Sequence, residues 1–114
     1  MSDQTVGVYI LLKIKDINSG WREFISSTVN KVKLLGNPNL YEYYVNNGEI
    51  DLHERFPNNE AWLRHIDYFT KEVAKDFLNH FEIKQFRVYG PVNDKIKEVG
   101  KSFEAKYFDA VGKI

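Results

Sequence analysis

Apolar residues alternate or recur with a regular period along most of the chain, and this pattern predicts four strands. Residues 6–15 are rich in β-branched side chains and too short for a buried helix, so we expect a strand there. The other strands are expected over 40–45, 49–56 and 80–89. Asn47-Gly48, between the second and third strands, is a strong signal for a tight hairpin.

Two segments between these strands carry apolar residues at helical spacing. The first is expected to be capped by Asn18 or Ser19 and to end at Gly36, a residue suited to the left-handed conformation after a helix. The second is expected to be capped at 58–59. Its period continues to Phe77, as one long helix or two short ones.

A third helix is expected over 94–111, where Gly100 costs roughly 1 kcal/mol relative to alanine and can break it. The order of elements is therefore β-α-β-β-α-β-α. The first six spell the ferredoxin-like split βαβ arrangement of the α+β class. We expect a single domain over residues 1–114, with 91–114 as a C-terminal helical extension.

Apolar and aromatic side chains are expected on both faces of the sheet. Three pairs are expected opposite the main apolar rows: Tyr9 and Leu11, Tyr41 and Tyr43, and Phe86 and Val88. A sheet with two apolar faces needs a second cover. We expect a homodimer paired through the sheet face, with the third helix as the alternative cover within one monomer.

Composition narrows the class of protein. The 114 residues are 43% hydrophobic and 15% aromatic, which suits a single domain with its own core. Sixteen basic and sixteen acidic residues give a net charge of zero, so neither nucleic acid nor a membrane surface is an expected partner. The chain has no cysteine, which excludes disulfides and thiolate metal sites. No leader or long apolar run is evident, so a cytoplasmic location is expected.

Residues 54–65, Glu-Arg-Phe-Pro-Asn-Asn-Glu-Ala-Trp-Leu-Arg-His, resemble the motif of the antibiotic biosynthesis monooxygenase family. That motif has a Glu, an aromatic residue two positions later, a polar helix start with Glu-Ala, and a His. Glu54, Phe56 and His65 match in type and spacing, although Trp or Tyr is common where Phe56 stands. By element order the resemblance covers residues 5–90.

The resemblance implies a dimeric α/β barrel and a possible activity. Some family members oxidise quinols or anthrones with O₂ and need no metal or flavin, because the deprotonated substrate reduces oxygen itself. The protein then supplies a dry aromatic pocket, a base and stabilisation of the anion. No cofactor is expected. Since many members have no established reaction, the alternative is a non-catalytic dimer that binds a small apolar molecule or acts as a scaffold.

His65 and Glu54 are the candidate catalytic residues. His65 lies on the apolar stripe of its helix, and a histidine titrates near neutrality, so it can accept a phenolic proton. Glu54 lies among apolar neighbours and must be paired or have a raised pKa, with His65 or Arg87 as the partner. The alternative is a structural pair that closes the helix onto the sheet.

The candidate substrate-binding residues are aromatic: Trp21, Tyr44, Phe56, Trp62 and Phe69. Their alternative role is plain core packing, the commoner role for such residues.

A metal site is not expected, because the three histidines lack the spacing of known metal motifs. His53 is expected on the strand face opposite Glu54, away from His65, and His80 is expected to begin the fourth strand. A related branch of the superfamily degrades haem with an Asn, a Trp and a His. Residues 6–15 contain no Asn, so haem degradation is the least expected of the three functions.

Overall fold

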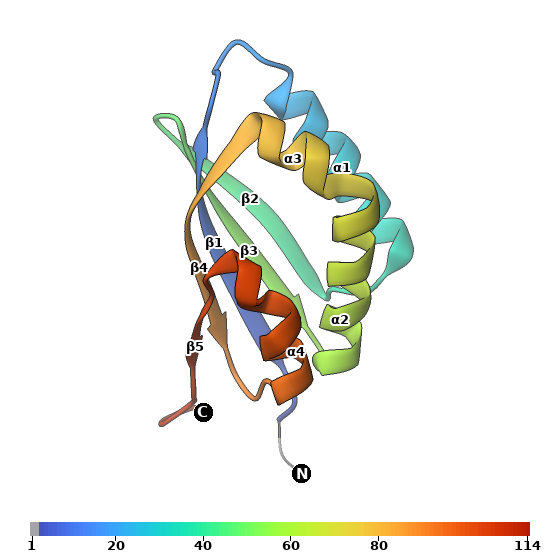
Figure 1. The fold of residues 1–114 in the computed structure, drawn as a ribbon, viewed down its shortest axis with the longest axis vertical. Coiled ribbons are helices and arrows are strands. Elements are labelled where there is room, and N and C mark those ends of the chain that lie inside the picture. Colours follow the sequence, from blue (N-terminus) through green and yellow to red (C-terminus); the bar gives the residue numbers. More distant parts are fainter. Residues whose placement is uncertain (1–2) are drawn as a thin grey trace.

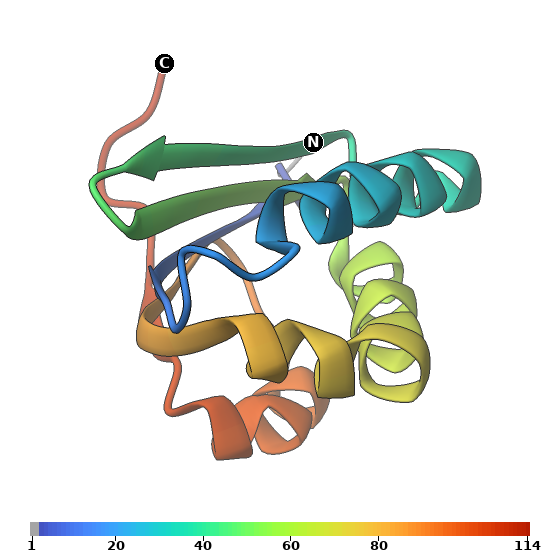
Figure 2. The ribbon, with the colours of Figure 1, turned by 90° about the horizontal axis from the view of Figure 1, so that it is seen from above.

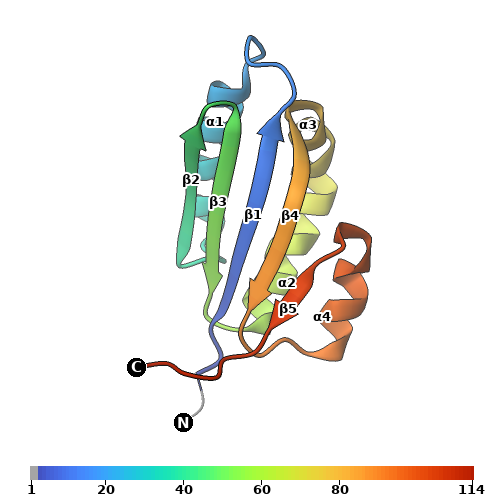
Figure 3. The ribbon, with the colours of Figure 1, turned by 90° about the vertical axis from the view of Figure 1, so that its left-hand side faces the viewer.

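The structure, a computed structural model, describes residues 3–114 and contains one five-stranded sheet. The strands are β1 (Val6–Ile14), β2 (Leu40–Asn46), β3 (Glu49–Phe56), β4 (Phe81–Tyr89) and β5 (Lys106–Phe108). They lie in the order β2-β3-β1-β4-β5 (Figure 3), with β4 and β5 parallel and the other neighbours antiparallel. The first four strands are those predicted, and β4 begins one residue later than expected, at Phe81.

The helices all pack on one face of this sheet (Figures 1 and 2). They are α1 (Trp21–Leu35), α2 (Asn59–Tyr68), the π-helical turn η1 (Phe69–Val73), α3 (Ala74–His80), α4 (Asp94–Val99) and the 3-10 turn η2 (Gly100–Phe103). This arrangement confirms the predicted α+β, ferredoxin-like fold. In the part of the chain that the structure describes, none of the helices has the length and apolar character needed to cross a membrane.

Of the two predicted ends of α1, the C-terminal end is confirmed and the N-terminal cap is not. Gly36 has a φ of 72° and donates its N–H to the Val32 carbonyl, which confirms the predicted helix stop. The predicted cap at Asn18 or Ser19 is wrong. Gly20 precedes the helix instead, and neither side chain is used because Asp16 holds both residues in a turn through their N–H groups.

The second helical segment runs from α2 through η1 into α3 with no loop between them, although the Val73 backbone departs from helical values at a φ of −122°. Asn58 accepts a hydrogen bond from the Ala61 N–H at 2.9 Å, so it is the cap that the pattern placed at 58–59. The apolar period continues to Phe77, which is fully buried. The sequence pattern left open one long helix or two short ones. The structure has two helices, α2 and α3, joined by the π-helical turn η1.

Tyr41 and Tyr43 of β2 lie on the helix-covered face, not on the opposite face as predicted. Tyr41 pairs with Glu54 and Tyr43 with Leu52 in the β2–β3 ladder. Cross-strand partners share a face, and Leu52 is buried in the core. The register therefore places both tyrosines under the helices.

Phe86 and Val88 of β4 also lie on the helix-covered face, again contrary to the prediction. Val88 pairs with Val8 and Phe86 with Ile10. The β1–β4 register shifts between Leu11 and Leu12, where β4 has one extra residue, Lys84, so apolar residues of β4 point inward on both sides of the irregularity. The opposite side of the sheet, here called the open face, keeps only the Tyr9 and Leu11 pair of the three predicted.

The C-terminal segment differs most from its prediction. The helix expected over 94–111 ends at Val99, continues as η2 and reverses direction at Glu104, whose φ is 54°. The chain then pairs as β5 along β4. Gly100 permits this path because a Cβ there would lie 2.9 Å from the Tyr107 hydroxyl.

The core lies between the sheet and the helices. Its fully buried side chains include Val6, Val8, Leu12, Phe56, Phe81 and Val88. Two ionisable residues, Glu54 and His65, are buried with them, each 5% exposed.

Candidate functional site

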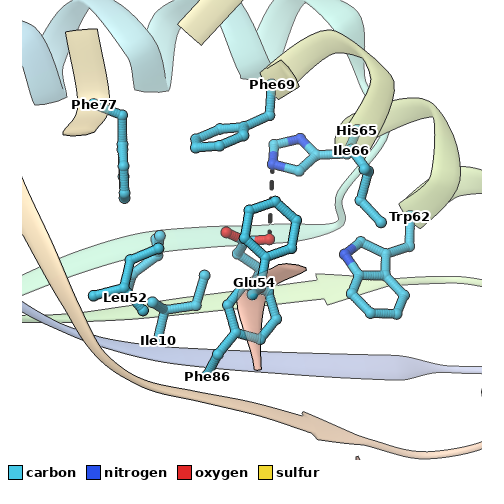
Figure 4. Close-up of a pocket in the computed structure, with 11 residues that line it drawn as sticks. Ile10, Leu52, Glu54, Trp62, His65, Ile66, Phe69, Phe77 and Phe86 are labelled. Carbon is cyan, nitrogen blue, oxygen red and sulfur yellow. Dashed lines mark ion pairs between the residues drawn. The ribbon is translucent and has the colours of Figure 1, made fainter. Parts of the chain in front are cut away.

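A cavity of about 40 Å³ lies in this core, between the sheet and the α2–η1–α3 run (Figure 4). The sheet contributes Glu54 from β3 and Phe86 from β4, and the helical run contributes Trp62, His65 and Phe69. The remaining lining residues are apolar: Ile10, Leu52, Ile66, Phe77, Ile83 and Phe103. Glu54 and His65 are therefore the ionisable side chains in an otherwise hydrophobic wall.

Glu54 and His65 meet across the gap between strand and helix. The His65 Nε2 lies 3.7 Å from the Glu54 Oε1, longer than a normal hydrogen bond (Figure 4). Two local features aim them at each other. Glu54 takes its inward direction from the alternation along β3, and the Asn58 cap fixes where α2 begins and so which face carries His65.

Burial changes the protonation of both residues, in opposite directions. It raises the pKa of Glu54 to about 8, because the charged carboxylate loses its water. It lowers the pKa of His65 to about 4, because the imidazolium loses its water too. Near neutral pH the pair is therefore a carboxylic acid beside a neutral imidazole. One partner can donate a proton and the other can accept one.

Aromatic rings surround His65. Its ring centroid lies 5.2 Å from that of Phe56 and 5.5 Å from that of Tyr41, the latter edge-on. These rings hold the imidazole in place and keep water from it. Phe56 also packs on Trp62 at 6.4 Å, so it supports the cavity wall from behind rather than lining it.

Tyr41 and Tyr43 form a hydroxyl pair near Glu54 that the sequence analysis missed. Their oxygens lie 2.8 Å apart, and burial, with Glu54 nearby, raises the pKa of both phenols. The predicted hairpin between the second and third strands could have revealed this pair, because its turn fixes the register of the two strands. A two-residue turn at Asn47-Gly48 sets Asn46 opposite Glu49, and counting back along both strands places Tyr41 opposite Glu54.

The structure brings together four of the predicted site residues and leaves two apart. Glu54, His65, Trp62 and Phe69 line the cavity. Trp21 is buried at the start of α1 and donates its Nε1–H to the Ile17 carbonyl, away from the cavity. Tyr44 is 52% exposed and packs against His53 at 5.3 Å on the open face.

The remaining candidate partners also lie outside the cavity. Arg87, a possible partner of Glu54, pairs with Tyr9 on the open face. His53 lies on that face too, as predicted, with its Nε2 3.3 Å from Asp51. His80 ends α3 rather than beginning β4, and its Nδ1 lies 3.1 Å from the Ser19 hydroxyl. Among residues 3–114, no three His, Cys, Asp or Glu side chains group closely enough to hold a metal ion.

Comparisons with known proteins support the fold. No family model and no curated protein matches this chain. Among solved structures, it is similar to MupZ from Pseudomonas fluorescens, with a TM-score of 0.87, 14% identity, and 97% of this chain and 93% of that chain covered. A structural-genomics protein, YJCS, gives a TM-score of 0.59 at 18% identity, with 74% of this chain and 95% of that one covered.

A third solved structure, protein SO0527 from Shewanella oneidensis, gives a TM-score of 0.54 at 14% identity and covers 76% of this chain and 88% of that chain. At these identities the three similarities establish a shared fold and nothing more specific. The match to MupZ covers 97% of the chain, so it includes most of the C-terminal segment.

Proposed function

We propose that the cavity binds a small aromatic hydroxyl compound of the quinol or anthrone type, and that the protein oxidises it with O₂ without a cofactor. One observation carries the proposal: a buried acid and a buried base, Glu54 and His65, face an apolar cavity 3.7 Å from each other. The resemblance of residues 54–65 to the antibiotic biosynthesis monooxygenase motif supports the same function.

The chemistry requires a base and a dry pocket. Neutral His65 accepts the phenolic proton, and the imidazolium that forms stabilises the phenolate beside it. The pairing of imidazolium with phenolate offsets the low pKa of His65, because the negative charge of the phenolate forms beside the imidazole as it takes the proton. The electron-rich anion then transfers electrons to O₂.

The oxygen balance is that of a monooxygenase. O₂ adds to the ring carbon that bears hydrogen, and the peroxide anion takes the proton held by His65 to form a hydroperoxide. His65 then removes the remaining hydrogen of that carbon as the O–O bond breaks, and loss of water leaves a carbonyl. A CH₂ group and O₂ thus become C=O and H₂O, with all electrons supplied by the substrate. The Glu54 carboxylic acid protonates the departing hydroxide, and the Glu54 carboxylate then takes the proton held by His65.

The test is oxygen uptake by the purified, metal-free protein with a panel of quinols and anthrones. We expect a rate above substrate autoxidation that His65→Ala lowers by about 10²- to 10⁴-fold, the usual contribution of a general base. His53→Ala is the matched control, since His53 lies on the open face, and it should keep the wild-type rate. Equal rates in both variants, or no uptake with any substrate, would refute the proposal.

The alternative is a non-catalytic dimer that binds a small molecule or acts as a scaffold, and the size of the cavity favours the scaffold form. A volume of about 40 Å³ holds water or O₂, whereas ligand sites usually measure roughly 300 Å³ or more. In that reading Glu54 and His65 close the helix onto the sheet. A protein that neither binds nor oxidises any compound of the panel would support the scaffold, whereas a ligand that binds and is never oxidised would support the binding form.

We also propose that two copies pair through the open face as a homodimer. Aromatic side chains gather there: the Tyr9 and Tyr89 ring centroids lie 5.3 Å apart, and Phe108 stacks on Tyr89 at 5.0 Å. This face holds fewer apolar residues than the sequence suggested, because Tyr41 and Phe86 point to the helices instead. Helices leave it uncovered (Figure 3).

A further inference from the structure

The ring of Phe103 closes one side of the Glu54–His65 cavity. It lies on η2 and stacks on Phe86 of β4, with ring centroids 5.4 Å apart and ring planes 16° apart. Both rings line the cavity. Removal of the Phe103 ring would leave a flat slot against Phe86, continuous with the space in front of the acid–base pair.

The segment that carries Phe103 is fastened at its two ends. At the first end, the Asn59 side chain donates to the Pro91 carbonyl at 2.8 Å and accepts from the Asn93 N–H at 2.9 Å. At the second end, β5 pairs with β4 and the Gly90 N–H donates to the Phe108 carbonyl at 3.0 Å. Residues 94–104, here called the C-terminal lid, lie between these fastenings.

The closed position of the C-terminal lid has two unfavourable features. The Tyr107 hydroxyl is buried beneath it and, among residues 3–114, finds no hydrogen-bond partner. Glu104 adopts a left-handed backbone with a φ of 54°, which a residue with a side chain seldom adopts. Lifting the lid would expose the hydroxyl to water. The closed state is therefore held less firmly than the core beside it.

We infer that Phe103 is the gate and the specificity-determining residue of the cavity, which admits a flat aromatic molecule whose ring replaces that of Phe103 against Phe86. The inference rests on the cavity being the ligand site of the proposed function. It does not require that the ligand be oxidised. The parallel stacking of the two phenyl rings is what selects a planar ligand over a compact, rounded one.

The test measures binding of 2-naphthol by equilibrium dialysis under nitrogen, so that oxidation cannot contribute. Phe103→Ala removes the ring that the ligand must displace, and we expect its Kd to fall about tenfold below that of the wild type. The matched control is Tyr44→Ala, an aromatic residue of β2 that packs against His53 at the open face, away from the lid and the cavity. Its Kd should stay within about twofold of the wild type.

A second variant gives the opposite sign and does not depend on how Phe103→Ala folds. Tyr107→Phe removes the unpartnered hydroxyl, and this loss stabilises the closed lid. 2-Naphthol should therefore bind this variant at least about threefold more weakly than the wild type. In Phe103→Ala, 1-adamantanol, a compact non-planar alcohol, should bind at least about tenfold more weakly than 2-naphthol.

Three results would overturn the inference that Phe103 is the gate. They are unchanged or weaker 2-naphthol binding in Phe103→Ala, tighter 2-naphthol binding in Tyr107→Phe, and equal binding of 2-naphthol and 1-adamantanol in Phe103→Ala. If the binding results hold and no quinol is oxidised, the proposed oxidation fails and the gate stands. If quinols are oxidised and Phe103→Ala leaves binding unchanged, the gate fails and the oxidation stands.

Discussion

At the scale of single residues, the decisive feature is that one environment acts in opposite directions on two side chains. Burial favours the uncharged form of each, so the pKa of Glu54 rises and that of His65 falls. The pair then carries a proton on the carboxyl group and none on the acceptor nitrogen of the imidazole. Such divergence marks candidate acid–base sites, although structural pairs can show it too.

The pair gives stability a defined pH dependence. Glu54 keeps its proton to about pH 8 when folded but releases it from an ordinary value of 4.5 when unfolded, so stability falls as pH rises between these values. His65 has a folded pKa of about 4 and an ordinary value of 6.5, so stability falls as pH drops between those values. The two effects cancel between pH 4.5 and 6.5.

Above pH 6.5 the Glu54 effect dominates, and the free energy of unfolding should fall by about 1 kcal/mol by pH 8. Urea denaturation at a series of pH values measures it. Glu54→Gln carries no titrating proton and should abolish the fall, while His53→Ala should keep it. A wild-type curve that stays flat from pH 6.5 to 8 would contradict the raised pKa.

At the scale of elements, the α2–η1–α3 run presents five residues to the cavity: Trp62, His65, Ile66, Phe69 and Phe77. The run depends on its start. Asn58 accepts from the Ala61 N–H at 2.9 Å and satisfies one of the donors that a helix leaves free. The π-helical turn η1 begins at Phe69, and such turns are frequent at functional sites.

Asn58→Ala should lower the free energy of unfolding by about 1 kcal/mol, the usual effect of losing a capping side chain. Chemical denaturation at pH 6 measures this change. Asn58→Asp retains an acceptor oxygen at the same place and should restore most of the loss. The capping role would be refuted if the alanine variant were as stable as the wild type.

The elements also show how far the sequence was predictive. Strong periodicity and the Asn47-Gly48 turn predicted β1 to β4, α1 and α2. The apolar setting of Glu54 predicted a partner and left His65 and Arg87 open, and the structure places His65 beside it. The C-terminal helix was predicted too long, because the stripe that continues past Gly100 belongs to Tyr107 of β5 packing on β4. Local periodicity cannot distinguish a helix face from a strand whose pairing is set by tertiary contacts.

Pairing between strands explains the main wrong prediction at the site, which concerns the sheet face of Tyr41 and Phe86. The prediction for Tyr41 and Phe86 is wrong because one strand by itself does not fix which of its faces meets the helices. Register sets that face and, in β4, so does the irregularity between Leu11 and Leu12 of β1. The Glu54–His65 pair needed only one strand and one helix. The closing role of Phe103 required knowing how the C-terminal segment folds back.

At the scale of the whole molecule, the protein has one covered sheet face and one open face. The core, the cavity and the lid all belong to the covered side, and the open face mixes aromatic rings with charged side chains such as Asp51 and Arg87. A neutral chain with this face fits a second copy better than nucleic acid, because there is no excess of positive charge.

Leu11→Arg places a charge in the middle of the open face and should convert the proposed dimer to a monomer in sedimentation velocity. Leu34→Arg makes the same change on α1, where Leu34 is already 87% exposed, and should leave the dimer intact. If wild type sediments as a monomer at concentrations up to those used for the assays, the open face is not a dimer interface.

The central claim is that Glu54 and His65 form a neutral acid–base pair at the cavity, and the protonation of Glu54 tests it most directly. Carbon-13 NMR of the labelled Glu54 carboxyl, followed with pH and assigned with Glu54→Gln, reports it. We predict a protonated carboxyl at pH 7 with a pKa of about 8. A carboxylate already ionised at pH 7, beside a protonated His65, would contradict the account and indicate an ion pair that serves only to close the helix onto the sheet.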